Sequence, residues 1–276
     1  MAANPTIPTE LGTEKIGKLL KQYALPAIIA QTASSLYNMV DSIFIGQGVG
    51  PLAISGLAVT FPLMNLSTAF GTLVGAGAAT MLSVLLGQKN YKAANKVLGS
   101  VVVLNIIIGL IFMAAALIFI DPILYFFGAS ENTLPYAKEY ISIILIGNVI
   151  THLYFGLNAA MRSSGNPKKA MGLTIFTVVF NTILDPIFIF GFGMGVKGAA
   201  LATTIAQTIS AILCFIRLIR YKTEYQVHIR KIRFKEAEYL PDVALSADLR
   251  KSRQIVKEMF TIGIPVTVSS TVLSLT

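Results

Sequence analysis

The sequence predicts an all-α polytopic membrane protein, a six-helix transmembrane bundle followed by the start of a seventh helix. Three observations support this prediction. Of the 276 residues, 54% are hydrophobic and only 13% are charged, whereas soluble domains carry about 25% charged residues. The apolar residues gather in stretches of about 20 or more, which is the length that a helix needs to cross a bilayer. The Lys and Arg residues fall between these stretches.

Six complete apolar spans follow one another along the chain. They are predicted at 24–46, 53–86, 98–120, 139–161, 170–192 and 198–219, and a seventh begins near residue 255. The second span is long for one crossing, so we expect it to tilt or to extend beyond the bilayer. The predicted parts are an amphipathic cytoplasmic N-terminus at 1–23, a six-helix lobe at 24–220, a basic cytoplasmic connector at 221–254 and the truncated start of a second lobe at 255–276.

The basic residues sort to one side of this predicted membrane. Of the 22 Lys and Arg residues, all but Lys138 and Lys197 fall on the side of the N-terminus. By the positive-inside rule, the N-terminus is cytoplasmic. The net charge of +9 therefore indicates membrane topology and contact with anionic lipids, and no nucleic-acid partner is expected.

The sequence does not favour an enzyme. One cysteine, Cys214, excludes an internal disulfide and a CxxC motif. His152 and His228 lie far apart in the sequence and show no zinc-ligand pattern. Neither HExxH nor GxSxG occurs. We expect no cofactor other than a coupling ion.

An internal repeat suggests a two-lobe architecture. Residues 16–37 (IGKLLKQYALPAIIAQTASSLY) align without gaps with 255–276 (IVKEMFTIGIPVTVSSTVLSLT), and Pro26 matches Pro265. Six spans separate the two segments, so both helices enter from the same side, as in the parallel repeats of secondary transporters. Chance similarity between apolar segments is the alternative. If the repeat is real, the chain is a fragment, and the missing second lobe is its intramolecular partner.

Five of the predicted spans each carry one polar face, at the spacing of three and four residues that defines one side of a helix. These faces comprise Gln31, Ser34, Asn38 and Asp41 with Tyr37 in the first span; Asn65, Thr68 and Thr72 in the second; Asn148, Thr151, Tyr154 or His152, and Asn158 in the fourth; Thr174, Asn181 and Asp185 in the fifth; and Thr203, Gln207, Ser210 and Cys214 in the sixth. Together they predict a bundle around a wet cavity. Hydrogen bonding between packed helices is the alternative for the Ser and Thr residues.

Asp41 and Asp185 are the strongest candidates for function, because they are the only acidic residues well inside the spans. No Lys or Arg lies at the same depth, and a charge at the bilayer centre costs roughly 2.5–3.5 kcal/mol on insertion scales. Such a carboxylate either takes up a proton or binds a cation. Amide oxygens are hard ligands that suit Na⁺, so Asp41, Asn181 and Asp185 are a candidate Na⁺ site. His152 is either a hydrogen-bonded packing residue or a proton carrier.

Three prolines lie inside predicted spans, at Pro26, Pro62 and Pro186. Each removes one backbone hydrogen bond and can kink its helix. Pro186 directly follows Asp185, and Pro26 lies about four turns before Asp41. We therefore predict that Pro26 and Pro186 bend their helices, with a fixed kink as the alternative to a moving part.

Four segments carry a resemblance to a known family. They are ALPAIIAQTASSLYNMVDSIFIG, GAGAATMLSVLLGQKNYKAANKVL, NAAMRSSGNPKKAM and GMGVKGAALATTIAQ. In order and spacing they resemble the multidrug and toxic compound extrusion (MATE) family over nearly the whole chain, and above all its bacterial members with an Asp in helix 1 and another in helix 5. The resemblance implies a twelve-helix, monomeric antiporter in a bacterial inner membrane. Such a protein exports small organic cations and drugs against inward H⁺ or Na⁺ flow.

The resemblance also implies a cation site in the N-terminal lobe. Its residues are Asp41, Asn158, Asn181, Asp185 and Thr203, with Tyr37 beside them. From the polar faces described above, the residues expected to line the cavity or support the site are Gln31, Ser34, Asn38, His152 and Gln207. Asn148 or His152 could face the site in place of Asn158. Coupling to H⁺ and coupling to Na⁺ both stay open. A flippase for lipid-linked precursors, with a related fold, is the alternative function and is expected to have a more cationic cavity.

Overall fold

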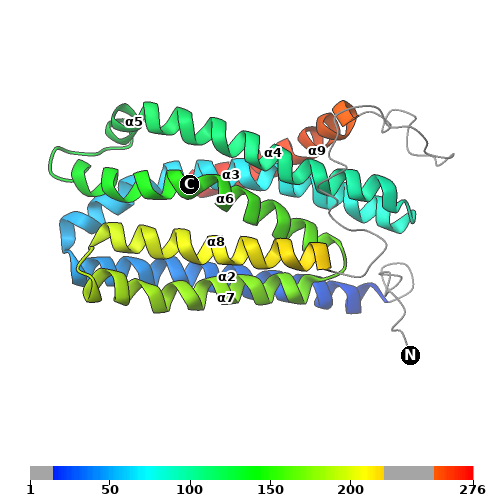
Figure 1. Ribbon diagram of the computed structural model, residues 1–276, viewed down its shortest axis with the longest axis horizontal. Coiled ribbons are helices and arrows are strands. Elements are labelled where there is room, and N and C mark those ends of the chain that lie inside the picture. Colours follow the sequence, from blue (N-terminus) through cyan, green and yellow to red (C-terminus); the bar gives the residue numbers. More distant parts are fainter. Residues whose placement is uncertain (1–14, 221–251, 276) are drawn as a thin grey trace.

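The computed structural model describes residues 15–220 and 252–275, and within these ranges the chain is helical without strands. The elements are α2 (Ile16–Gly48), α3 (Pro51–Gly87), α4 (Tyr91–Ile118), α5 (Ile120–Phe126), α6 (Leu134–Ser163), α7 (Pro167–Pro186), the π-helix η1 (Ile187–Gly191), α8 (Val196–Arg220) and α9 (Ser252–Leu275). The long helices run roughly along one common direction (Figure 1). The predicted all-α class is confirmed, whereas the predicted connector and most of the predicted N-terminal segment lie outside the described residues.

Five of the described helices are long and apolar enough to cross a membrane. They are α3, α4, α6, α7 continued through η1, and α8. The chain is therefore a multi-pass membrane protein. The predicted first span corresponds to α2, which has 33 residues but is not one of the five, because Gln31, Asn38 and Asp41 make its middle more polar. That α2 also crosses the membrane stays a prediction.

The boundaries of the helices follow local chemistry. Pro51 occupies the first turn of α3, where its missing N–H removes no helical hydrogen bond. Asn90 caps α4 by accepting a hydrogen bond from the Ala93 N–H at 3.2 Å. α4 ends at Ile118, and the chain restarts as the short helix α5. Pro122 has no N–H to donate to the Ile118 carbonyl, so the span predicted at 98–120 ends two residues early.

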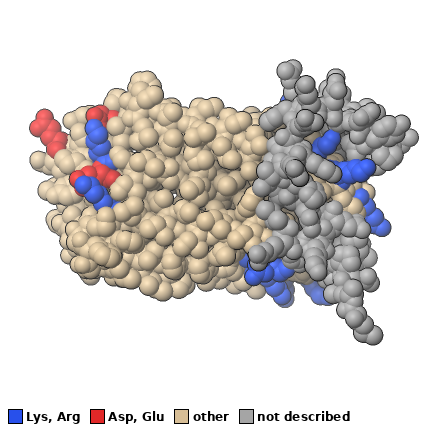
Figure 2. All heavy atoms as spheres, in the orientation of Figure 1, with Lys and Arg blue, Asp and Glu red and all other residues tan. Residues whose placement is uncertain are grey.

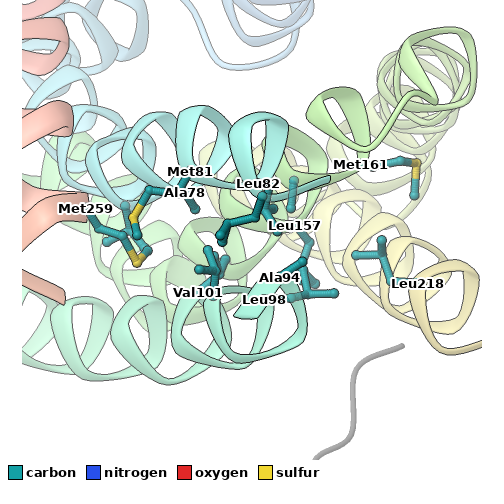
Figure 3. Packing of buried hydrophobic residues seen from close by; sticks show 14 of the residues in the cluster. Ala78, Met81, Leu82, Ala94, Leu98, Val101, Leu157, Met161, Leu218 and Met259 are labelled. Carbon is teal, nitrogen blue, oxygen red and sulfur yellow. The ribbon is translucent and has the colours of Figure 1, made fainter. Parts of the chain in front are cut away.

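α6 lies at the centre of the bundle. It packs against α3, α4, α7 and α8, while α2 packs mainly along α7. A large apolar core joins α3, α4, α6, α8 and α9. In Figure 3, Leu82, Val101 and Leu157 lie within this core, and Met259 reaches it from α9 beside Met81. A smaller cluster that includes Ile45, Leu57 and Ile189 packs nearer the site described below.

Charged side chains gather at the two ends of the molecule and leave an uncharged belt between them on the face shown in Figure 2. At the end that holds the starts of α6 and α8, Lys138 lies 2.7 Å from Asp121 and Lys197 lies 3.1 Å from Glu139. These are the two basic residues that the sequence assigns to the non-cytoplasmic side. Which end faces the cytoplasm stays a prediction.

α9 approaches α3 closely through two glycines. A Cβ added to Gly77 would collide with the backbone of Met259, and a Cβ added to Gly263 would collide with the Leu73 carbonyl oxygen. Met259 is 1% exposed. α9 is therefore held against α3 by backbone contacts that only glycine permits.

We expect Gly77→Ala to destabilise the protein by roughly 1–3 kcal/mol, because the new methyl group has no room against α9. Gly87→Ala is the matched control, since Gly87 ends the same helix and its Cβ would meet no atom within 4 Å. Thermal unfolding in detergent measures both variants. Equal melting temperatures for the two variants would contradict the close α3–α9 contact.

Candidate functional site

Asp41 on α2 and Asp185 on α7 lie near enough for their charges to interact. Asp41 is 4% exposed and Asp185 is fully buried. The ion pairs found among the described residues involve Lys138 and Lys197 at the end of the bundle, and neither includes these two aspartates. Two like charges are thus enclosed together without a basic partner in the part of the chain described.

A hydrogen-bonded network ties three helices around the carboxylates. Asn181 Nδ2 donates one hydrogen bond to Asp185 Oδ1 at 3.2 Å and another to Thr203 Oγ1 at 3.3 Å. The Tyr37 hydroxyl lies 2.8 Å from the same Thr203 oxygen. Asn181 and Asp185 can meet because they are four residues apart on one face of α7. The network therefore links α2, α7 and α8.

Tyr140 on α6 completes the site, and the sequence analysis did not identify it. Its side chain is 2% exposed and lies near enough to the Asp41 carboxylate for the two groups to interact. A signal for it was present in the sequence. Tyr140 lies on the helix face that also holds Gly147, Thr151 and Asn158, at spacings of seven, four and seven residues.

Three oxygens of this site have no hydrogen-bond partner among the described residues. They are Asp41 Oδ1, Asn181 Oδ1 and Asp185 Oδ2, and all three are buried. Buried polar atoms nearly always have a partner. Carboxylate and amide oxygens are the ligands that hard cations prefer, and a carboxylate can alternatively take up a proton. The residues present therefore fit either Na⁺ or H⁺.

The backbone of α7 changes directly after Asp185. α7 ends at Pro186 and continues as the π-helix η1. Proline has no N–H for the carbonyl four residues earlier, and π-helical turns occur often at functional sites. Pro26, by contrast, lies inside the uninterrupted helix α2. Bending at either proline stays a prediction.

Several residues predicted for the site form their hydrogen bonds with groups other than the two carboxylates. Asn158 donates to the Ala170 carbonyl at 3.2 Å and to Thr174 Oγ1 at 3.5 Å, so no described bond joins it to the carboxylates. Gln207 accepts from Thr151. His152 and Asn148 both lie beside Ser67 on α3. Their roles in cation binding stay predictions.

Part of the predicted polar face of α2 is exposed. The side chains of Gln31 and Asn38 are exposed and Ser34 is half-buried, whereas Tyr37 and Asp41 point into the bundle. Of the residues that the sequence proposed for the site, the structure brings together Tyr37, Asp41, Asn181, Asp185 and Thr203.

Comparison with known proteins identifies relatives for this fold and site. The MatE family model matches residues 26–187. The chain is 30% identical over 259 residues to the multidrug export protein MepA of Staphylococcus aureus (strain MRSA252), a match that covers 94% of this chain and 54% of that protein. MepA of Staphylococcus haemolyticus is 30% identical over 250 residues, covering 91% of this chain and 52% of that protein. The chain thus spans about half the length of these relatives.

Solved structures show the same fold. A crystal structure of MATE in the bent conformation superimposes with a TM-score of 0.83 at 24% identity, and the match covers 96% of this chain and 56% of that one. An outward-facing multidrug resistance MATE family transporter also matches with a TM-score of 0.83 at 24% identity, over 97% of this chain and 56% of that one.

We expect Thr203→Val to lower the free energy of unfolding by about 1–3 kcal/mol, because it leaves the buried groups of Tyr37 and Asn181 without their shared oxygen. Thr208→Val is the matched control on the same helix. Its hydroxyl donates only to the Thr204 carbonyl of its own helix, at 2.7 Å, so the change should stay within about 0.5 kcal/mol. Chemical or thermal unfolding compares the two, and a control loss as large as that of Thr203→Val would count against the network.

Proposed function

Because this chain belongs to the MatE family, we propose that it is the N-terminal lobe of a multidrug efflux transporter, which exports small organic cations and drugs in exchange for H⁺ or Na⁺. The observation that carries this proposal is the pair of buried carboxylates, Asp41 and Asp185, with their unpartnered oxygens. The multidrug export proteins among its relatives support the same function.

The proposed role of the site is to bind the coupling cation and so to link α2 with α7. When the site holds H⁺ or Na⁺, the repulsion between the two carboxylates is removed and the helices can pack closely. When the cation leaves, the two charges repel each other in a low-dielectric interior, which favours separation of the helices or entry of water. The network of Tyr37, Asn181 and Thr203 would change with this step, because it contacts both helices.

The proposal extends to the membrane location, the orientation and the oligomeric state of the protein. We place the chain in a bacterial inner membrane with its N-terminus cytoplasmic, acting as a monomeric transporter rather than as an enzyme. The remaining half of the relatives' length would supply a second lobe and part of the substrate-binding surface. The flippase alternative is disfavoured, because the site is acidic and the described middle parts of the spans contain no Lys or Arg.

We expect Asp41→Asn and Asp185→Asn each to abolish export of an ethidium-type dye, because an amide neither takes up a proton nor carries the charge that holds Na⁺. The measurement is dye accumulation in pump-deficient cells that express the full-length reading frame. Asp121→Asn is the control, since that carboxylate pairs with Lys138 at the end of the bundle and should leave export intact. Export that survives both site substitutions would rule out the proposed coupling site.

We expect Tyr140→Phe to lower the concentration of coupling ion that gives half-maximal export by roughly 10-fold, about 1.4 kcal/mol. The Tyr140 hydroxyl stabilises the free Asp41 carboxylate, so its removal favours the cation-bound state. Tyr154→Phe is the control, because that hydroxyl bonds Thr174 at 3.2 Å rather than a carboxylate. Initial export rates are measured against Na⁺ at fixed pH and against pH without Na⁺, and an unchanged midpoint in both series would argue against a role for Tyr140.

A further inference from the structure

A second buried polar cluster lies on a different face of α6, between α3, α4 and α6. It consists of Ser67 on α3, Asn105 on α4, and Asn148 and His152 on α6, and none of these residues is more than 6% exposed. Neither the carboxylate site nor the proposed transport cycle uses it.

The hydrogen bonds of the cluster favour one protonation pattern of His152. The Ser67 hydroxyl donates to Asn148 Oδ1, so its only hydrogen is used. The same Ser67 oxygen lies 3.2 Å from His152 Nε2 and can only accept there. With this orientation of the Asn148 amide, the favoured tautomer of His152 carries its proton on Nε2 and leaves Nδ1 as an acceptor.

Three atoms of this cluster have no hydrogen-bond partner in the part of the chain described: His152 Nδ1, Asn105 Oδ1 and Asn148 Nδ2. The imidazole Nδ1 points toward α4, since a Cβ added to Gly109 would lie 3.5 Å from it. Asn105 lies one turn before Gly109 on the same face of α4. Two acceptors and one donor without partners call for an occupant that can both donate and accept hydrogen bonds.

The charges around the cluster select a neutral occupant. α3 contains no charged residue, and α4 contains only Lys92 and Lys96, in its first two turns. The charged residues of α6 are Lys138 and Glu139 near its start and Arg162 near its end. A cation or an imidazolium would thus have no carboxylate beside it among these three helices. The centroid of the Phe112 ring lies 6.1 Å from the centroid of the His152 imidazole, so an apolar ring borders one side of the cluster.

We propose that this cluster is an internal water site, in which a bound water molecule donates hydrogen bonds to His152 Nδ1 and Asn105 Oδ1 and joins α4 to α6. His152 is then a neutral residue of the water site and not a proton carrier. The site is independent of the carboxylates. A water in this position also gives His152 Nδ1 and Asn105 Oδ1 a hydrogen-bond partner in an interior that lipid surrounds.

Nitrogen-15 NMR of histidine tests this proposal. The whole 276-residue chain is reconstituted in lipid bilayers with ¹⁵N-labelled histidine, and His228→Gln assigns the signals of His152, because the chain has two histidines. We expect a protonated Nε2, an unprotonated Nδ1, and magnetisation transfer from water protons to Nδ1. A protonated Nδ1, or an Nδ1 without transfer from water, would overturn the proposal.

Two variants locate the water. Asn105→Leu should abolish the water transfer to Nδ1 while the Nε2 proton remains. Thr72→Val is the control on α3, because its hydroxyl bonds only the backbone of its own helix, and it should leave the transfer unchanged. Transfer that persists in Asn105→Leu would refute the bridge to α4. If Asn105→Leu does not fold, the spectrum of the unmodified chain still decides whether the water is present.

A titration with Na⁺ distinguishes the proposed water site from the proposed cation site at Asp41 and Asp185. The His152 signals should not shift with Na⁺ concentration, and a Na⁺-dependent shift that persists in Asp41→Asn would show that the occupant is a cation and would overturn the proposal of a water. The result does not depend on export, so a failure here leaves the proposed transport function unaffected.

Discussion

The central constraint on this bundle is the pair of carboxylates that it encloses without a basic partner among residues 15–220 and 252–275. Asp41 and Asp185 come from helices far apart in the sequence, yet their charges interact in an interior where the described ion pairs do not reach them. Asn181 donates one hydrogen bond to Asp185, and Tyr140 lies beside Asp41, while buried oxygens of both carboxylates have no hydrogen-bond partner among the described residues. A carboxylate whose oxygens all accept hydrogen bonds from the protein has no free oxygen to offer to a cation. Under the proposed function, these open oxygens are what would let the site bind and release a cation.

The central helix α6 separates two kinds of polar chemistry. Tyr140 and Asn158 lie on the faces toward the carboxylates and α7, and Asn148 and His152 lie on the face toward α3 and α4. The first cluster is charged and lies beside the π-helical continuation of α7, while the second is neutral and packs among close glycine contacts. If both proposals hold, a site that changes its occupancy and a site that holds helices together occupy different faces of α6.

Much of the fold and the centre of the site could be predicted from the sequence, because a membrane interior imposes strong patterns. Apolar runs predict every long helix and most of the helix ends, although α2 and α4 begin eight and seven residues before the predicted spans. Asp41 and Asp185 stand out as the only acids well inside the spans. The rotation of α6 about its axis could not be predicted, because it depends on packing against several helices at once. The sequence for that reason keeps His152 and Asn148 as alternatives to Asn158 and does not single out Tyr140. The contact of Gly77 with α9 depends on the distance between two helices, which a sequence pattern does not report.

Difference infrared spectroscopy of the chain in bilayers tests most directly whether the carboxylate pair binds a cation. If Asp41 and Asp185 bind H⁺ or Na⁺, the spectrum should show carboxyl or carboxylate bands that respond to pH or to Na⁺. These bands should be lost or altered in both Asp41→Asn and Asp185→Asn but not in Asp121→Asn. Bands that respond to neither ion, or that survive both site substitutions, would contradict the account.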